Sequence, residues 1–597
     1  MRLSHTFGAV ALLSSLTAGL TAGLAAGSAM AQQTTKQAAD AQAPEIASGL
    51  SEKKTVHARE QMVAAANPLA AQAGLDALRK GGTAADALVA VQTVLGLVEP
   101  QSSGIGGGAF LVWYDAASGK VTTFDGRETA PAAATPELFL DDKGEPLPFF
   151  DAVVGGRSVG APGVVRLMET IHTRAGKLEW DALLQPAIRL ASEGFTVSPR
   201  LHTLIEGDKG RLDTQATARA YFYDKDGNAL AVGSVLKNPD YAETLKTIGK
   251  EGADGFYKGK IAEKIIAAVK AHDGNPGLLS LEDLAAYEVK EREAVCAPYR
   301  GLDVCGMGPP SSGALTVGQI LGMVSEFDLE TLGPDDPETW RIIGDATRLA
   351  FADRGRYMAD SDFVKMPKGL LDPNYLKDRA ALLRRPTALG ADDVKAGDPP
   401  WDKAELRIDG MSFEQPSTSH FVIVDKDGNI ASMTTSVESA FGSRQMAAGF
   451  ILNNQLTDFS FRPEADGEAV ANRVQPGKRP RSSMSPTIVL QDGKPLYALG
   501  SPGGSNIIPY VTNTIIALVD WKMNMQQAID LPHLTNRFGT YTLEAGTPAE
   551  EFKADLDALG FKTSIGDLNS GLHGITITPQ GLEGGADPRR EGVAMGD

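Results

Sequence analysis

The chain has 597 residues, 42% of them hydrophobic, and a net charge of −18 from 57 basic and 75 acidic side chains. It is long enough to bury a large core, and its negative charge argues against nucleic acid or an anionic membrane as a partner. Two cysteines are too few for a structural metal site, and the eight histidines lack metal-ligand spacing. We therefore expect no metal, and no motif indicates a cofactor.

The N-terminus has the pattern of a secretory signal peptide. Arg2 and His5 precede an apolar run over residues 7–26, and small residues at 29–31 suit a signal peptidase. The run is rich in Ala, Gly, Ser and Thr, which makes it weakly apolar for the alternative, a permanent anchor helix. We expect residues 1–31 to be removed and the mature protein to be periplasmic or secreted, with no membrane span.

Residues 68–98 have the pattern of two helices. Pro68 suits a first helical turn, two glycines break the pair, and Thr83 is placed to cap the second helix. The stretch SSGIGGGAF at 102–110 then leads into a strand. A phosphate-binding loop needs its glycines between a strand and a helix, so we expect these glycines to allow close backbone approach within a sheet instead.

Further helices alternate with loops in the middle of the chain, at 163–174, 180–192, 259–272 and 337–351. Residues 386–416 have no apolar period, and we expect an exposed linker there.

The two cysteines flank the eight residues APYRGLDV, in which Arg300-Gly301 suits a tight turn. A hairpin centred on that turn places Cys296 opposite Cys305. A disulfide and a pair of buried thiols both remain open at this point.

From residue 417 onward the pattern becomes strongly β. Residues 421–425 and 430–436 flank a turn, and residues 486–504 form a second hairpin. An apolar helix at 507–521 follows, with two more helices near 525–531 and 548–559. This order along the chain, with helices, then hairpins, then helices, predicts an α+β layered sandwich of antiparallel sheets covered by helices.

Three hydroxyl side chains, at 417–419, stand directly before the first of these strands. Pairing Asp425 with Ile430 across the turn sets the register of the two strands to within one or two residues. This register places part of the partner strand beside Thr418. This part consists of Ser436, Val437 and Glu438, with Val437 directly opposite. The alternative interpretation is a solvated sheet edge.

A hydroxyl nucleophile needs a base. His420 is too close in the chain to Thr418 to be positioned freely, as the histidine of a Ser-His-Asp triad must be. A threonine at an N-terminus can instead use its own α-amine, whose pKa of about 7.7–8.0 leaves a fraction neutral at pH 7. This hypothesis requires a cut between Ser417 and Thr418.

Seven motifs in order resemble the γ-glutamyltranspeptidases, a family of N-terminal nucleophile hydrolases, over residues 55–597. They are EPQSSGIGGGAF, DGRETAP, GMGPPSSGA, STSHF, ILNNQLTDF, KRPRSSMSPT and GSPGGS. The resemblance implies a four-layer αββα sandwich of two antiparallel sheets. It also implies a precursor that cuts itself into a large subunit (32–417) and a small subunit (418–597), which stay together as a heterodimer in one globular domain.

The resemblance implies roles for individual residues. Thr418 is similar to the nucleophile, and Ser436 to the residue that hydrogen-bonds its amine. Main-chain N–H groups of Gly503 and Gly504 would stabilise the oxyanion. The α-carboxylate of the substrate would bind Arg127, Ser482 and Ser483. The α-ammonium would bind Glu438, Gln455 and Asp458.

The implied reaction attacks the γ-glutamyl amide of glutathione or a related compound and forms a γ-glutamyl-enzyme. Water, or the amine of an amino acid or dipeptide, would then take the acyl group. Two alternatives remain open: a glutaryl (cephalosporin) acylase of the same superfamily, and a catalytically silent binding relative. Thr418, Arg127 and the pair Gly503-Gly504 argue against a catalytically silent protein. Glu438 and Asp458 favour a substrate with an ammonium group.

Overall fold

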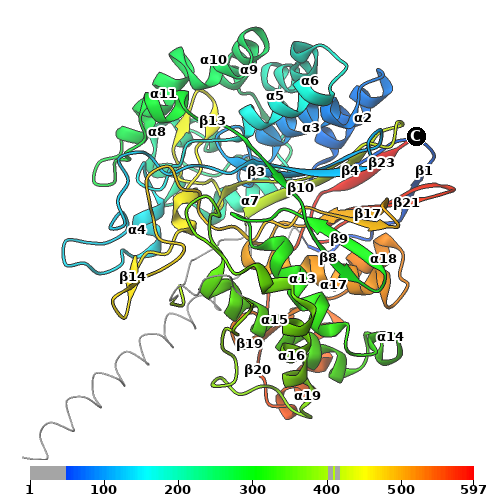
Figure 1. The fold of residues 1–597 in the computed structure, drawn as a ribbon. Helices are drawn as coiled ribbons and strands as arrows, with labels where there is room; N and C mark the ends of the chain where they lie inside the picture. The colour runs from blue at the N-terminus through cyan, green and yellow to red at the C-terminus, as the bar shows by residue number, and fades with distance from the viewer. Residues whose placement is uncertain (1–48, 401–407, 411–416) are drawn as a thin grey trace, which may run out of the picture. The chain divides into compact units, whose positions relative to one another are not determined.

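Two seven-stranded antiparallel sheets form the centre of the fold (Figure 1). The computed structural model describes residues 49–400, 408–410 and 417–597, so the predicted signal peptide lies outside the described residues. We call the sheets the β10 sheet and the β17 sheet.

The β10 sheet has the strand order β23–β2–β10–β11–β3–β4–β7. Its strands are β2 (Met62–Ala65), β3 (Gly108–Asp115), β4 (Lys120–Gly126), β7 (Lys290–Glu293), β10 (Ser417–Val424), β11 (Ile430–Glu438) and β23 (Val593–Gly596). The β17 sheet has the order β1–β22–β21–β17–β16–β9–β8. Its strands are β1 (Val56–Ala58), β8 (Val295–Tyr299), β9 (Leu302–Gly306), β16 (Thr487–Gln491), β17 (Lys494–Gly500), β21 (His573–Thr578) and β22 (Gly581–Ala586).

The two sheets pack face to face through an apolar layer. Val422 and Val424 of β10 share this layer with Ile488 of β16 and Ile575 of β21. Side chains alternate between the faces of a strand, so Phe421 and the other odd-numbered apolar residues of β10 point to the opposite side, toward helices. The second half of the strand, residues 421–424, is apolar throughout because both of its faces are buried.

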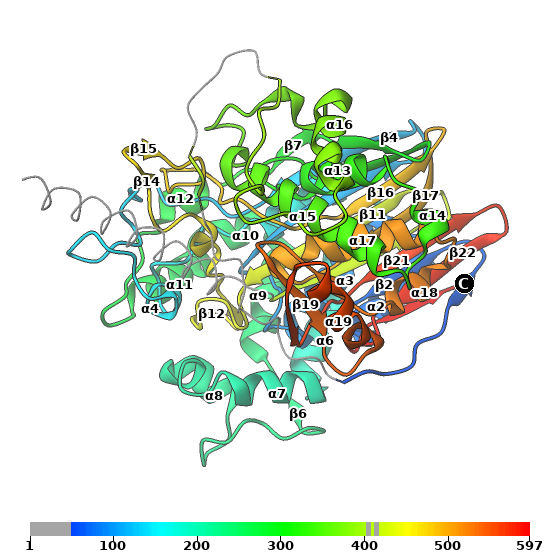
Figure 2. The ribbon, with the colours of Figure 1, turned by 90° about the horizontal axis from the view of Figure 1, so that it is seen from below.

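Helices cover the outer face of each sheet (Figures 1 and 2). Those that share a core with the β10 sheet include α2 (Pro68–Arg79), α3 (Ala84–Val98), α5 (Val164–Ala175), α6 (Trp180–Glu193), α9 (Pro239–Glu251), α10 (Asp254–Tyr257) and α11 (Gly259–Lys270). Those that share a core with the β17 sheet include α13 (Gly313–Val324), α15 (Pro337–Tyr357), α16 (Pro373–Ala381), α17 (Ile507–Val519), α18 (Met525–Asp530) and α19 (Lys553–Ala558). The layers are therefore αββα, as the resemblance implies.

Further helices and strands connect these elements along the chain. They include α4 (Phe149–Val153), α7 (Pro199–Gly207), α8 (Ala216–Phe222), α12 (Leu281–Ala285), α14 (Leu329–Leu332), β18 (Leu534–Thr535), β19 (Thr540–Glu544) and β20 (Lys562–Gly566). Across the described ranges, no helix combines the length and apolar character that a membrane span requires.

The predicted helices at 68–98 are confirmed, and Thr83 caps α3 in a capping box with Asp86. Helix α15 extends to Tyr357, beyond the predicted end at 351, because Arg354 and Tyr357 are buried and hydrogen-bond to residues elsewhere in the chain. The glycines before β3 do allow close backbone approach. A Cβ on Gly107 would lie 2.1 Å from the carbonyl oxygen of Ser436.

The predicted register of the β10–β11 hairpin is wrong by one residue. Ile430 pairs with Val424 and not with Asp425. The side chain of Asp425 accepts hydrogen bonds from the main-chain N–H groups of Asp427 and Asn429, which holds residues 425–429 in a longer turn. Thr418 consequently lies opposite Ser436.

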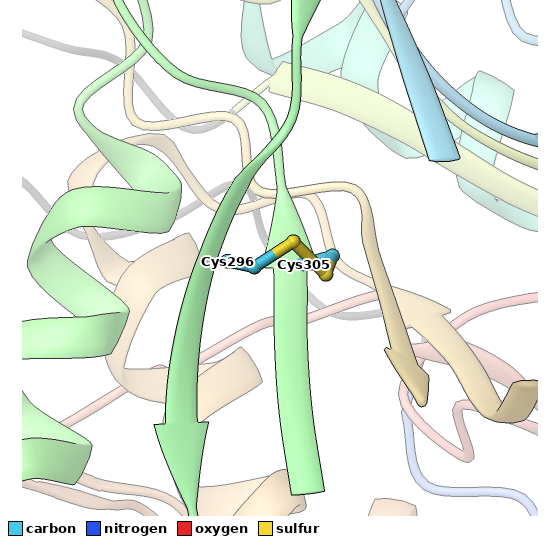
Figure 3. The surroundings of a disulfide bond; sticks show 2 residues. All are labelled: Cys296 and Cys305. Atoms are coloured by element: carbon cyan, nitrogen blue, oxygen red, sulfur yellow. A yellow bond between two sulfur atoms is a disulfide. The ribbon is translucent and has the colours of Figure 1, made fainter. Parts of the chain in front are cut away.

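Strands β8 and β9 place Cys296 directly opposite Cys305, as the hairpin argument predicts. The two form a disulfide, shown in Figure 3. The predicted linker at 386–416 has neither helix nor strand in its described parts, 386–400 and 408–410, where Ile408 forms an isolated β-bridge with Val470. Residues 401–407 and 411–416 lie outside the described residues.

Candidate active site

Thr418 lies at the start of β10 and is only 3% exposed. Its Oγ1 is 3.2 Å from Oγ of Ser436 on the neighbouring strand β11. The Thr418 carbonyl oxygen accepts a hydrogen bond of 3.1 Å from the guanidinium of Arg590. The nucleophile candidate is therefore fixed at both its side chain and its main chain.

Ser436 also contacts the peptide that precedes Thr418. Its hydroxyl donates to the Ser417 carbonyl oxygen over 2.8 Å and accepts from the N–H of Glu438 over 2.8 Å. Since a serine hydroxyl has a single proton, the Thr418 hydroxyl is the donor in its bond with Ser436. On the other side, the Ser417 hydroxyl donates to the carbonyl oxygen of Gln101.

A cavity of about 20 Å³ opens beside Thr418. Its lining consists of Arg127, Thr418, Ser436, Glu438, Gln455, Asp458, Ser482, Ser483, Met484, Gly504 and Ile507. Nine of these are residues that the sequence predicted for the site. Gly503 and Ser417 complete the predicted set and stand next to lining residues, but do not line the cavity themselves.

Arg127 follows β4 and is 1% exposed. Its Nε donates to the Pro480 carbonyl and its Nη2 to the Arg481 carbonyl, at 3.2 and 2.9 Å. Nη2 also lies 2.5 Å from Oδ2 of Asp458. Two carbonyls and one carboxylate thus fix the orientation of a buried guanidinium.

Asp458 belongs to a short 3-10 turn, Gln455–Asp458, and also accepts from the Gln455 side chain at 2.7 Å. Glu438 ends β11 with a φ of 82°, a backbone conformation that is uncommon outside glycine. Its carboxylate accepts from the side chain of Asn454. Two carboxylates therefore face one small cavity.

Ser482 and Ser483 precede β16 and are held by residues from elsewhere in the chain. Ser312 donates to the Ser482 carbonyl, and Arg354 of α15 donates to the hydroxyl groups of both Ser483 and Ser312. Sequence reasoning quoted the motif around Ser312 without giving it a role. It missed Arg354, whose sequence neighbourhood has no distinguishing signal.

Gly503 and Gly504 join β17 to a 3-10 turn, Gly504–Asn506, that continues into α17. Gly503 has a φ of 137°, and a Cβ there would lie 2.7 Å from the ring of Tyr510. Only glycine fits this position. The main-chain N–H groups at a helix start are suited to stabilise negative charge.

Glu128, the neighbour of Arg127, is a second residue that sequence reasoning missed. It is fully buried, and its carboxyl oxygens have no hydrogen-bond partner among the described residues. Burial raises its pKa to about 8, although Arg127 acts in the opposite direction. A neutral carboxyl group therefore lies beside the guanidinium at neutral pH.

Comparison with known proteins agrees with this geometry. The family model described as Gamma-glutamyltranspeptidase matches residues 70–597. The chain belongs to the γ-glutamyltranspeptidase family.

The chain is similar to several known proteins, of which two relatives and one solved structure are described. It is 37% identical to the "Glutathione hydrolase proenzyme" of Bacillus subtilis (strain 168), over 90% of this chain and 92% of the relative. It is 33% identical to the "Acylase ACY 1 proenzyme" of Pseudomonas sp. (strain SE83), over 93% and 97%. The cephalosporin acylase of Bacillus halodurans matches with a TM-score of 0.79 and 28% identity, over 92% of this chain and 97% of that one.

Proposed function

We propose that this γ-glutamyltranspeptidase family member cuts itself before Thr418 and then transfers γ-glutamyl groups to water or to an amine. The Thr418 hydroxyl would attack the Ser417 carbonyl carbon, while Ser436 donates to the carbonyl oxygen. The acyl group would shift from nitrogen to oxygen, giving an ester. Water would hydrolyse the ester, releasing the Ser417 carboxylate and the α-amine of Thr418. The products would be a large subunit, 32–417, and a small subunit, 418–597.

The freed α-amine would then serve as the base for the second reaction. It accepts the proton of the Thr418 hydroxyl as the oxygen attacks the γ-carbonyl of the donor. Main-chain N–H groups of Gly503 and Gly504 stabilise the tetrahedral oxyanion. The leaving amine takes the proton and departs, and water or the amine of an amino acid or dipeptide resolves the γ-glutamyl-enzyme.

The pairing of Arg127 with Asp458 inside the cavity is the observation that carries the choice of substrate. A γ-glutamyl head group has both an α-carboxylate and an α-ammonium. When it binds, its carboxylate can take the place of Asp458 beside Arg127, and its ammonium can take the place of Arg127 beside Asp458. Arg127, with Ser482 and Ser483, would bind the carboxylate. Asp458, with Glu438 and Gln455, would bind the ammonium.

Acylase relatives make a glutaryl donor the second candidate. A glutaryl group has a carboxylate but only a methylene where the ammonium would be. No ammonium would then face Asp458 and Glu438, and the loss of a hydrogen bond between charged groups costs about 1.5–3 kcal/mol. A site built for a polar group rejects the analogue that lacks it.

The two donors are compared by assaying the anilides of γ-glutamate and glutarate with the purified wild-type protein. We expect a preference for the γ-glutamyl compound of about ten-fold or more. Equal cleavage of both anilides would favour the acylase. Absence of self-cleavage together with absence of turnover would favour a silent binding relative.

The proposal extends to location. Residues 1–31 would direct export and be removed, which places the processed enzyme in the periplasm or outside the cell. N-terminal sequencing of the large subunit from the native host tests this expectation.

A further inference from the structure

One buried carboxylate, that of Asp125, lies behind the arginine of the predicted substrate site. Asp125 is fully buried on β4, two residues before Arg127. Its Oδ1 accepts from the main-chain N–H of Arg127 at 3.0 Å. Its Oδ2 accepts from Arg479 at 2.7 Å and from Arg292 at 2.9 Å.

The contact with Arg479 joins Asp125 to the other half of the same site. The two residues after Arg479 supply the carbonyl groups, Pro480 O and Arg481 O, that orient the Arg127 guanidinium. Ser482 and Ser483 follow directly. The Asp125 carboxylate therefore hydrogen-bonds both to the main chain of Arg127 and to the side chain of Arg479. Arg479 begins the segment 479–483, which carries the two carbonyl acceptors of Arg127 and the two serines.

Other groups hold the same junction from outside. The main-chain N–H of Arg479 donates to Asp360 at 2.9 Å. Arg292 also donates to Asp362, to which Lys290 donates as well. The Tyr287 hydroxyl donates to the Arg127 carbonyl oxygen. Tyr287 also lies against Arg479, whose guanidinium carbon is 5.9 Å from the centre of its ring. Asp125 differs from Tyr287 because its carboxylate hydrogen-bonds to both Arg127 and Arg479, and it does not line the cavity.

We propose that Asp125 is a positioning residue for the donor's α-carboxylate, acting through Arg127 and the 479–483 segment. The inference rests on the proposed function. A planar guanidinium binds a carboxylate well only when its fork has the right orientation. Since this contact is remote from the reacting γ-carbonyl, its loss should weaken binding of substrate and transition state alike and raise KM more than it lowers kcat.

The test compares Asp125→Asn with a matched control, Asp345→Asn. Asp345 is also fully buried, accepts from one main-chain N–H and pairs with two arginines, Arg348 at 2.8 Å and Arg341 at 4.0 Å, but it is not a cavity residue. We expect KM for γ-glutamyl anilide to rise about ten-fold or more in Asp125→Asn, with kcat changed by less than about three-fold. Asp345→Asn should leave KM unchanged. Asp125→Glu keeps the charge but lengthens the side chain, and should raise KM in the same way.

An unchanged KM in the Asp125 variants, or a loss confined to kcat, would overturn the proposal. So would the failure of both Asp125 variants to accumulate as self-cleaved protein while Asp345→Asn does, because Asp125 would then serve folding alone. If the wild type itself does not cleave the γ-glutamyl anilide, the proposed function fails, and that outcome is distinct from the others.

Discussion

The Ser436 hydroxyl donates a 2.8 Å hydrogen bond to the carbonyl oxygen of Ser417, which belongs to the peptide bond before Thr418. The same hydroxyl accepts the hydrogen bond from Thr418. One side chain therefore contacts both the attacking oxygen and the oxygen on which negative charge would develop. This arrangement suits an intramolecular attack on the peptide.

Replacing Ser436 by alanine removes the donor to the Ser417 carbonyl. We expect self-cleavage to slow by about a hundred-fold or more, comparable to the loss of one oxyanion donor. Ser436→Thr keeps the hydroxyl and should still cleave. The time course of two-chain formation on a denaturing gel measures the effect, and rapid cleavage by the alanine variant would exclude this role.

Arg127→Lys keeps the positive charge but loses the planar fork. A lysine ammonium cannot reach the Pro480 and Arg481 carbonyls and bind a carboxylate with the same geometry. We expect kcat/KM for γ-glutamyl anilide to fall by one to several powers of ten, about 1.4 kcal/mol for each. Unchanged kinetics would assign Arg127 a structural role only.

Asp458→Asn removes the charge that would bind the donor's ammonium. The γ-glutamyl reaction should fall by about ten- to a hundred-fold, while the glutaryl reaction changes less, so the preference between the two narrows. Both anilides are assayed with both proteins. A parallel loss on the two donors would show that Asp458 acts through Arg127 and not on the ammonium.

Stability should decline in mild acid because of His573. Burial lowers its pKa to about 4 from 6.5, and burial together with His573 lowers that of His420. In this pH range the unfolded chain protonates His573, whereas the folded chain keeps it neutral. The free energy of unfolding therefore falls as pH drops from about 6.5 to about 4, by roughly 3 kcal/mol for His573. Urea unfolding of the uncut Thr418→Ala chain between pH 7 and 4 measures this, and adding His573→Gln should flatten the slope. An equal slope in both proteins would contradict it.

Sequence reasoning located the long elements well because their patterns are local. Pro68 and Thr83 marked helix starts, and the apolar hairpins were visible as strands. Strands β22 and β23 were missed, since GLEGGA and VAMG have little apolar alternation and form strands only through their partners in the sheets. The one-residue register error came from Asp425, whose side chain bonds within the turn in a way that spacing cannot reveal.

The sequence motifs identified the site residues, but they did not identify the residues that hold those site residues in place. Nine of the predicted residues line one cavity, although they come from distant parts of the chain. Arg354 and Arg590 lie outside the seven motifs, and Asp125 lies inside one of them, DGRETAP, without a predicted role. Each makes a contact that spans more than a hundred residues of sequence. A single sequence contains no signal for such pairings.

The proposed mechanism requires Thr418 to become an N-terminus through the action of its own hydroxyl group. Intact-mass analysis of the purified wild type and of Thr418→Ala, under identical conditions, tests it most directly. We expect two chains for the wild type, the smaller with the mass of residues 418–597, and one uncut chain for Thr418→Ala. A small chain that begins elsewhere, or efficient cleavage of Thr418→Ala, would contradict it.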